Sequence, residues 1–281
     1  MDNQKAAKLL RKINNVLSIC FDSSKTVASS VEIDVIIPVV KKDLRILPLC
    51  LAGIRDCVQH PIKNIYVVAP SEEEIIRFCQ DNYLQYIDET SVLGFGPKEL
   101  DLKIIEANGS IIDRSGWLFQ QLIKLSGTIG TCPNYLCIDA DHILLQPHAF
   151  ISSANEPVFY MSYERHQPYY DMIKTLTGIT NISKQSYVAH KMIVNRKQLA
   201  ALHHHISDYC GQYWIDAILS RYDRKQISGF SEYEIYGNYV KNKMMIPWKQ
   251  HSLKLKYVAD YQLLRKKYGR IYRSITFPEY Y

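Results

Sequence analysis

The chain has 281 residues and a net charge of +6, and 47% of its residues are hydrophobic and 22% charged. These values are ordinary for a folded globular protein and exclude a chain that is disordered over long stretches. The longest apolar runs, such as residues 35–40, are far too short to cross a bilayer, and residues 1–25 lack the continuous apolar stretch of a signal peptide. We therefore expect a cytoplasmic protein.

The cysteines support the same compartment. Seven are scattered along the chain, the number is odd, and no two form a C-x-x-C pair. Several of them, such as Cys50, Cys57 and Cys137, lie inside apolar patterns. Reduced, buried thiols of structural role explain this distribution best.

The first predicted elements alternate between strands and helices. Residues 1–30 predict a basic amphipathic helix followed by a connector rich in serine and threonine. Ser71 and Glu74 form a capping box, which predicts that a helix begins there. Apolar runs of strand length and helical spacing follow one another; the strands are expected at 33–40, 64–70, 84–89 and 134–141, and the helices at 44–58, after 71, and at 117–125. This pattern is typical of βαβ units and a mostly parallel sheet.

The second half of the chain has a more mixed pattern. Further strands are expected at 157–164 and 186–194, and further helices at 196–209 and from 231 onward. We expect one catalytic domain over 31–255, with a nucleotide-binding half up to 141 and an acceptor-binding half from 142. A basic tail rich in tyrosine follows at 256–281.

Two aspartates mark the strongest candidate site. Asp139 and Asp141 stand at the end of an apolar strand, where ligands bind in α/β sheets. Two carboxylates this close repel each other unless a positive group lies beside them, and Mg²⁺ or Mn²⁺ bound to substrate phosphates is such a partner. The alternative is a pair of aspartates that only cap a turn.

This segment resembles the D-x-D motif of GT-A glycosyltransferases, which follows a Rossmann-like half at a similar depth in the chain. The opening strand resembles the first strand of that fold, and the resemblance implies that Pro38 and Val39 contact the donor nucleotide. It covers about 31–255. It implies a mixed, mostly parallel sheet flanked by helices, a nucleotide-sugar donor with UDP as the default, and Mn²⁺ or Mg²⁺ held by Asp139 and Asp141.

A second segment also resembles glycosyltransferases, in this case bacterial polysaccharide and lipopolysaccharide enzymes with a G-W-x-x-Q-Q-x-x-K helix. Trp117, Gln120, Gln121 and Lys124 are spaced so that they share one helix face. Amides and an ammonium on one face suit a nucleotide sugar and its phosphates. The alternative is an ordinary amphipathic helix with Trp117 in the core.

The candidate general base lies near residue 232. Ser231 and Glu234 form a capping box, so a helix should begin there. The segment resembles the G-x-x-E-D motif of inverting GT-A enzymes, in which an acidic residue deprotonates the acceptor hydroxyl. The resemblance implies Glu232 first and Glu234 second as the catalytic base, although Tyr233 stands where the family has aspartate. The alternative is that both glutamates only favour a helix N-terminus.

The histidines are assigned to different roles. The resemblance implies a late histidine as metal ligand, and His251 is placed accordingly. His190, in a strand-like segment, is a candidate for the donor site or for the acceptor side, or else a satisfied half-buried histidine without such a role. His203, His204 and His205 occupy consecutive helical positions and point in three directions, so they cannot share a metal, and we expect them to face solvent.

The expected partners follow from these assignments. They are a nucleotide-sugar donor and a glycan or lipid-linked acceptor, and no nucleic acid. The basic tail, with tyrosines interleaved among its lysines and arginines, suits peripheral contact with an anionic membrane at its inner face, or simple packing on the domain.

Two other classes of function are considered. A nucleotidyltransferase or phosphoryl-transfer enzyme also uses D-x-D pairs, but the chain has no Walker-type loop. A nucleic-acid-binding protein would use the basic tail, but only that end of the chain is clearly basic.

Overall fold

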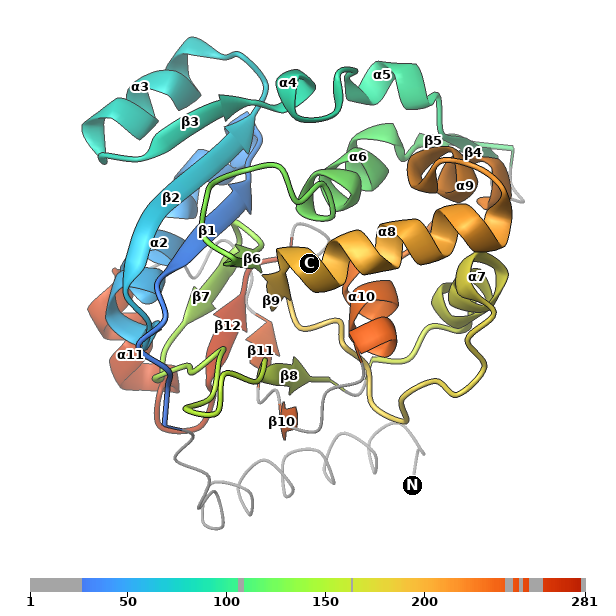
Figure 1. The fold of residues 1–281 in the computed structure, drawn as a ribbon. Helices are drawn as coiled ribbons and strands as arrows, with labels where there is room; N and C mark the ends of the chain where they lie inside the picture. The colour runs from blue at the N-terminus through green and yellow to red at the C-terminus, as the bar shows by residue number, and fades with distance from the viewer. Residues whose placement is uncertain are drawn as a thin grey trace, which may run out of the picture.

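A computed structural model of the chain describes residues 27–105, 109–162, 164–240, 245–247, 250–252 and 260–278. They form an α/β structure around one main sheet (Figure 1). The predicted N-terminal helix lies outside the described residues, as does most of its connector.

The main sheet has the strand order β3-β2-β1-β6-β9. Its strands are β1 (Ile33–Pro38), β2 (Ile62–Ala69), β3 (Gln85–Asp88), β6 (Asn134–Ile138) and β9 (Lys191–Asn195). β9 pairs antiparallel with β6, and the other neighbours are parallel, so the sheet is mixed and mostly parallel, as expected. Successive strands run outward from β1 to β3, and β6 then pairs on the other side of β1. The edge beyond the carboxyl ends of β1 and β6 is therefore a topological switch point, where α/β sheets bind ligands.

Helices flank this sheet. The longer ones in its neighbourhood are α2 (Leu47–Cys57), α3 (Glu73–Asp81), α6 (Ser115–Lys124), α8 (Arg196–Cys210) and α10 (Glu232–Val240). The centre of the sheet is covered: every residue of β1 is buried, and so are all but one residue of β6 and all but one of β9. The predicted start of α3 is wrong by one residue, since the N-cap is Glu72, which has the extended backbone of a cap, and not Ser71.

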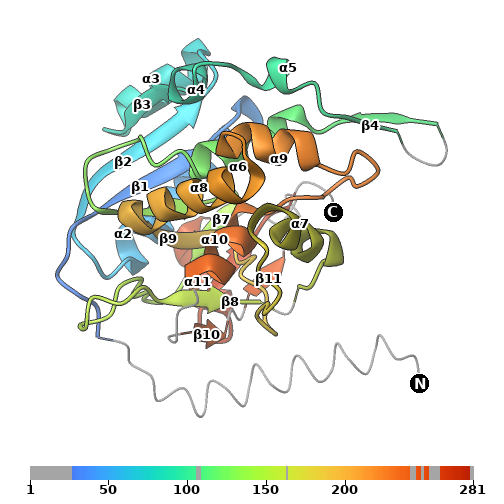
Figure 2. The same cartoon turned by 45° about the vertical axis from the view of Figure 1, so that its right-hand side comes forward.

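The remaining elements of the body are η1 (Lys41–Arg45), α4 (Glu89–Leu93), α5 (Pro97–Leu100), β4 (Lys103–Ile105), β5 (Ile111–Asp113), β8 (Phe159–Met161), α7 (Gln167–Thr177), α9 (Trp214–Arg221) and β10 (Met245–Pro247). The sequence patterns did not predict α7, α9 or the antiparallel pair β4–β5. Figure 2 shows β4 projecting from the body beyond α6 and α9.

A small second sheet has the order β11-β12-β7, with β7 at His142–Leu144, β11 at Gln250–Ser252 and β12 at Ser274–Thr276. Together with α11 (Tyr261–Tyr268) it encloses a separate apolar cluster against α2, formed by Ile46, Leu49, Ile143, Leu145, Tyr261, Leu264, Ile275 and Phe277. Figure 1 shows α11 beside α2. Residues 260–278 of the basic tail are thus part of the folded body.

Most predicted strands are shorter than expected, and two of these differences shape the candidate site. The strand at 134–141 ends at Ile138, because a turn at residues 139–141 redirects the chain into β7. The strand at 186–194 begins only at Lys191. Before it, His190 has φ of 57°, a left-handed conformation that cannot continue a strand.

The described cysteines are free thiols, and most of them are buried, as the sequence predicted. Cys50, Cys57, Cys79, Cys132 and Cys137 are free and buried, and Cys210 is free and half-buried. Among the described residues, no helix is both long and apolar enough to span a membrane.

Candidate functional site

The two predicted aspartates lie at the switch point of the main sheet. Asp139 directly follows β6, and its carbonyl oxygen accepts a hydrogen bond from the His142 backbone N–H at 3.0 Å, which closes the turn that carries Asp141. Pro38, at the end of the neighbouring β1, and the buried Val39 after it lie at the same edge. The structure therefore brings these four residues together at one edge of the main sheet, and their role in donor binding stays a prediction.

His190 completes the acidic cluster. Its Nδ1 lies 2.8 Å from Asp139 Oδ2, and its ring stacks on His142 with the centroids 5.6 Å apart. Potential ligand atoms of Asp139, Asp141 and His190 all lie within 4.8 Å of one another. Two carboxylates and one imidazole form a donor set that suits a divalent transition metal such as Mn²⁺. The residues present therefore fit the cofactor that the sequence predicted.

A buried lysine joins this cluster to α10. Lys124, the last residue of α6, donates to Asp139 Oδ1 and, at 2.8 Å, to Glu232 Oε1. The Tyr233 hydroxyl donates to Asp139 Oδ1 at 3.0 Å, and Lys124 Nζ lies 3.3 Å from the Tyr233 oxygen. Both oxygens of Asp139 are thus engaged, which fixes the plane of its carboxylate.

The charges of the cluster are strongly coupled. Burial alone would raise the pKa of Asp139, but the charge of Lys124 and the contact with His190 outweigh it and hold that pKa well below its usual range. Burial alone would lower the pKa of Lys124, but Asp139 and Glu232 raise it, so the ammonium stays charged. Burial and the charge of Asp139 raise the pKa of Asp141. The hydrogen bond and charge of Asp139 raise the pKa of His190 against the effect of burial.

Of the four α6 residues predicted to share one face, Gln121 and Lys124 contact the network around Asp139 and Glu232. Gln121 Oε1 accepts a hydrogen bond from the Glu232 backbone N–H at 3.2 Å, so α6 positions the first turn of α10. Gln121 Nε2 is buried and has no hydrogen-bond acceptor among the described residues. A buried donor left in this way is costly, so a bound ligand that accepts from it would be favoured. Trp117 and Gln120 are half-buried, and the Arg114 guanidinium lies 4.2 Å from the centroid of the Trp117 ring.

The two candidate bases have different surroundings. Glu232 is 6% exposed, and among the described residues its Oε2 has no hydrogen-bond donor. Glu234 is fully buried and accepts from Ser186 Oγ at 2.5 Å and from the Tyr187 backbone N–H at 3.2 Å. Burial raises the pKa of Glu234 to about 7. Its backbone N–H donates to Ser231 Oγ at 3.3 Å, which confirms the predicted cap of α10.

The remaining histidines are placed as follows. His251 lies in β11, where its backbone pairs in register with Ile275, but its side chain is outside the description, so its role as metal ligand stays a prediction. His204 is exposed, as expected. The prediction that His203 and His205 face solvent is wrong, because α8 packs between α9 and α7. The His203 ring stacks on Trp214 with the centroids 4.2 Å apart, and the His205 ring contacts the Thr177 carbonyl oxygen at 2.8 Å.

Two features of the site were missed by sequence reasoning. The contact of His190 with Asp139 depends on the antiparallel pairing of β9 with β6, which no local pattern reveals. Tyr233 was noted only as a departure from the family pattern, although its hydroxyl reaches Asp139. An aromatic hydroxyl directly beside the predicted base was the available signal.

The chain is similar to one protein family and, at low identity, to several solved structures. The model of a family described as "Family of unknown function (DUF6492)" matches residues 30–267, and no curated protein matches significantly. Mouse xyloside xylosyltransferase 1 in its apo form is 9% identical, with 88% of this chain and 97% of that chain covered and a TM-score of 0.48.

The galactosyltransferase LgtC in complex with donor and acceptor sugar analogs is 11% identical, with 87% of each chain covered and a TM-score of 0.46. An active-site mutant of LgtC is 12% identical, with the same coverage and TM-score. Likenesses at this level do not bear on activity, so the functional conclusion rests on the geometry of the site.

Proposed function

The chain belongs to DUF6492, a family of unknown function, and we propose that it is a metal-dependent glycosyltransferase of the GT-A type. The observation that supports this most is the cluster of Asp139, Asp141 and His190 at the switch point of the main sheet. Carboxylates at such an edge, next to a buried cation, suit a divalent metal and the diphosphate of a nucleotide sugar. The proposed reaction moves a hexose from a UDP-sugar to a glycan or lipid-linked acceptor.

In this proposal Asp139, Asp141 and His190 hold Mn²⁺ or Mg²⁺, with His251 as a further candidate ligand. When bound, the ion supplies positive charge that stabilises the departing nucleoside diphosphate. Asp139 is kept ionised and oriented by Lys124 and Tyr233, so its carboxylate needs no rearrangement when donor binds.

Other residues of the proposed donor site bind the nucleotide and the sugar. Pro38 and Val39 border the nucleotide at the end of β1, and Gln121 offers its buried Nε2 as a donor to a sugar or phosphate oxygen. Lys124 remains charged and adds positive potential near the phosphates. Trp117 and Gln120 are proposed as further donor contacts on the exposed side of α6.

The proposed general base is Glu232. Its Oε1 is held by Lys124, while its Oε2 is the oxygen that an acceptor hydroxyl would approach. Transfer with inversion follows if this oxygen takes the proton. Glu234, the second candidate, is enclosed by donors from Ser186 and Tyr187, and in the proposal it supports the first turn of α10 rather than contacting the acceptor. The contact of the basic tail with an anionic membrane stays a prediction.

The test is titration calorimetry of the purified protein with UDP, with and without Mn²⁺, on the wild type and on Asp141→Ala. The proposal expects binding of UDP that depends on Mn²⁺, is lost on addition of EDTA, and is lost in Asp141→Ala. Asp216→Ala, which removes an exposed aspartate on α9, is the matched control and should bind as the wild type does. Absence of metal-dependent binding with UDP, GDP and CMP would contradict the proposal.

Product analysis separates the proposal from nucleotidyl transfer. A glycosyltransferase releases a nucleoside diphosphate from its sugar donor, whereas a nucleotidyltransferase releases pyrophosphate. Release of pyrophosphate would assign Asp139 and Asp141 to that other reaction.

A further inference from the structure

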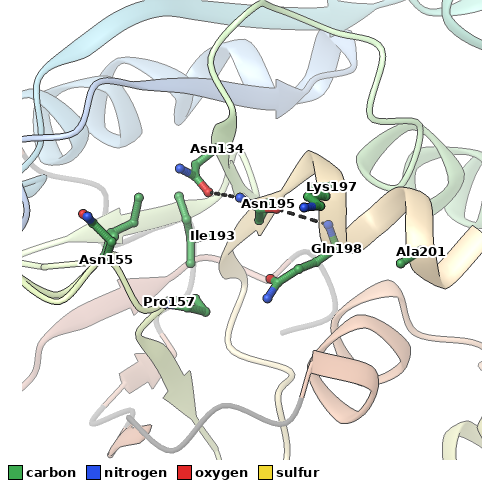
Figure 3. Close-up of a pocket in the computed structure, with 9 residues that line it drawn as sticks. Asn134, Asn155, Pro157, Ile193, Asn195, Lys197, Gln198 and Ala201 are labelled. Atoms are coloured by element: carbon green, nitrogen blue, oxygen red, sulfur yellow. Dashed lines mark hydrogen bonds between the residues drawn. The ribbon is translucent and has the colours of Figure 1, made fainter.

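A cavity lies at the start of β6, the end of the strand opposite to the aspartates, and Figure 3 shows its lining residues. Its volume is about 420 Å³, within the range of small-molecule pockets, roughly 300–1,000 Å³. It is bordered by Asn134 at the start of β6, by Ile193 of β9, by Gln198 in the first turn of α8, and by the loop of Asn155 and Pro157. Five residues of extended chain separate Asn134 from Asp139, a span of about 16 Å.

Consecutive hydrogen bonds fix the orientation of the side-chain amides of Asn195 and Asn134. The Gln198 backbone N–H donates to Asn195 Oδ1 at 3.1 Å, which makes Asn195 the cap of α8. Because the oxygen of Asn195 is used as an acceptor, its Nδ2 donates to Asn134 Oδ1 at 2.8 Å. The oxygen of Asn134 thus accepts from Asn195 (Figure 3), and the amide nitrogen of Asn134 has no acceptor among the described residues.

The amide of Gln198 is fixed in the same way. The Asn195 backbone N–H donates to Tyr236 Oη at 2.8 Å, so the Tyr236 hydroxyl turns its own hydrogen toward Gln198 Oε1, 3.3 Å away. Gln198 is therefore held through its oxygen, and its Nε2 is left as the pocket donor.

Asn155 repeats this arrangement from the loop between β7 and β8. Ser29 Oγ accepts from the Val31 backbone N–H at 3.2 Å and donates to Asn155 Oδ1 at 2.9 Å. Asn155 has φ of 59°, a left-handed conformation that asparagine tolerates better than most residues. Again the oxygen is occupied within the protein, and the amide nitrogen remains.

The lining is therefore rich in hydrogen-bond donors. Three amide nitrogens and the exposed ammonium of Lys197 offer hydrogen-bond donors, and the lining residues include no aspartate or glutamate. The buried Ile193 and the half-buried Pro157 add an apolar wall. Such a pocket suits a ligand with several acceptor oxygens, a negative charge and an apolar face.

We propose that this cavity binds an acidic saccharide through its carboxylate and ring oxygens, as an exosite for the remote part of a glycan acceptor. The choice of a saccharide rests on the proposed transferase function, whereas the preference for an anion rests on the lining alone. Binding energy from a remote part of a substrate positions its reacting end, and the aspartates lie about 16 Å from Asn134 through the sheet.

The experiment is titration calorimetry with trigalacturonate as the probe, with neutral maltotriose and inorganic phosphate measured in parallel. Gln198→Glu and Asn134→Asp keep the oxygens that accept from Tyr236 and Asn195, and they replace each free amide nitrogen by a charged oxygen. Lys197→Gln removes the ammonium from an exposed position and leaves every hydrogen bond above intact. Gln80→Glu, on the exposed side of α3 at the far side of the sheet, makes the same change of charge as a control.

The proposal expects trigalacturonate to bind the wild type and Gln80→Glu equally. Gln198→Glu and Asn134→Asp should each bind about tenfold or more weakly, and Lys197→Gln should also bind more weakly. Equal affinity in all variants, equal affinity for maltotriose, binding of phosphate alone, or no binding of trigalacturonate would overturn it. The titration with UDP and Mn²⁺ on the same variants should be unchanged. If the wild type does not bind UDP, the result counts against the proposed function. If the wild type binds UDP but not trigalacturonate, the result counts only against this cavity.

Discussion

Asp139 and His190 are 51 residues apart in the sequence and are joined by two hydrogen bonds. The Asp139 backbone N–H donates to the His190 carbonyl oxygen at 3.0 Å, and His190 Nδ1 lies 2.8 Å from Asp139 Oδ2. Both contacts directly follow the last antiparallel pair of the sheet, Ile138 with Lys191. The cluster is therefore fixed by strand pairing and not by loops alone, which favours a site with little reorganisation on binding.

We predict that His190→Ala weakens the binding of UDP in the presence of Mn²⁺ by at least tenfold, because it removes a ligand candidate and the orienting partner of Asp139. Titration calorimetry measures this, and His204→Ala, an exposed histidine of α8, is the control. Unchanged binding in His190→Ala together with its loss in His251→Ala would assign the histidine ligand to β11 instead.

Lys124→Met is expected to lower the free energy of unfolding by about 3–5 kcal/mol, because it leaves two buried carboxylates without their shared cation. Urea denaturation gives the value. Adding Glu232→Gln to this variant should recover part of the stability, since one buried charge is then gone. Lys41→Met, which breaks an exposed pair with Glu74, should change stability little. An equal effect of the two lysine variants would show that the buried network is not structural.

Gly237→Ala should destabilise the protein, because its new Cβ would lie 2.3 Å from Cγ of the Tyr187 ring, closer than any real contact. The cost is expected to be about 1–3 kcal/mol, as for other overpacked cores. Gly116→Ala has open space around it in α6 and should stabilise by about 0.5–1 kcal/mol. Thermal unfolding of both variants provides the comparison, and a stable Gly237→Ala would mean that α10 shifts readily.

Glu89→Gln tests a pH dependence. Burial and the charge of Asp88 raise the pKa of Glu89 from 4.5 to about 7. Between these values the unfolded chain has lost the proton and the folded chain keeps it, so this group makes the wild type less stable as the pH rises through that window. Glutamine cannot ionise, so the stability of Glu89→Gln relative to wild type should increase from pH 4.5 to 7 and stay level above it. Denaturation at several pH values measures the difference, and a constant difference would refute the assignment.

The sequence allowed the centre of the fold to be predicted because buried parallel strands are continuous apolar runs. This is why β1, β2 and β6 were found, and with them the position of Asp139 after β6. Lys124 was found through its helical spacing and Glu232 through its motif, but the contact between them was not predicted. That pairing depends on how α6 packs on α10.

Elements that depend on pairing between strands far apart in the chain could not be predicted from the sequence. β12 owes its place to antiparallel pairing with β7, and β9 owes its direction to β6. The strand predicted at 186–194 begins only at Lys191, because His190 has a left-handed backbone, and His190 is held there by contacts with Asp139. Context of this kind overrides local β-propensity.

The pairing of β12 with β7 also sets an order for biosynthesis. The Phe277 backbone N–H and the Thr276 hydroxyl both reach the carbonyl oxygen of Asp141, at 3.0 and 3.4 Å, and Thr276 is 135 residues further along the chain. During translation the acidic turn therefore emerges from the ribosome long before the strand that fastens it. A nascent chain stalled before residue 274 would lack the strand that holds Asp141, so the cluster of Asp139, Asp141 and His190 is expected to acquire its final geometry only at a late stage of synthesis.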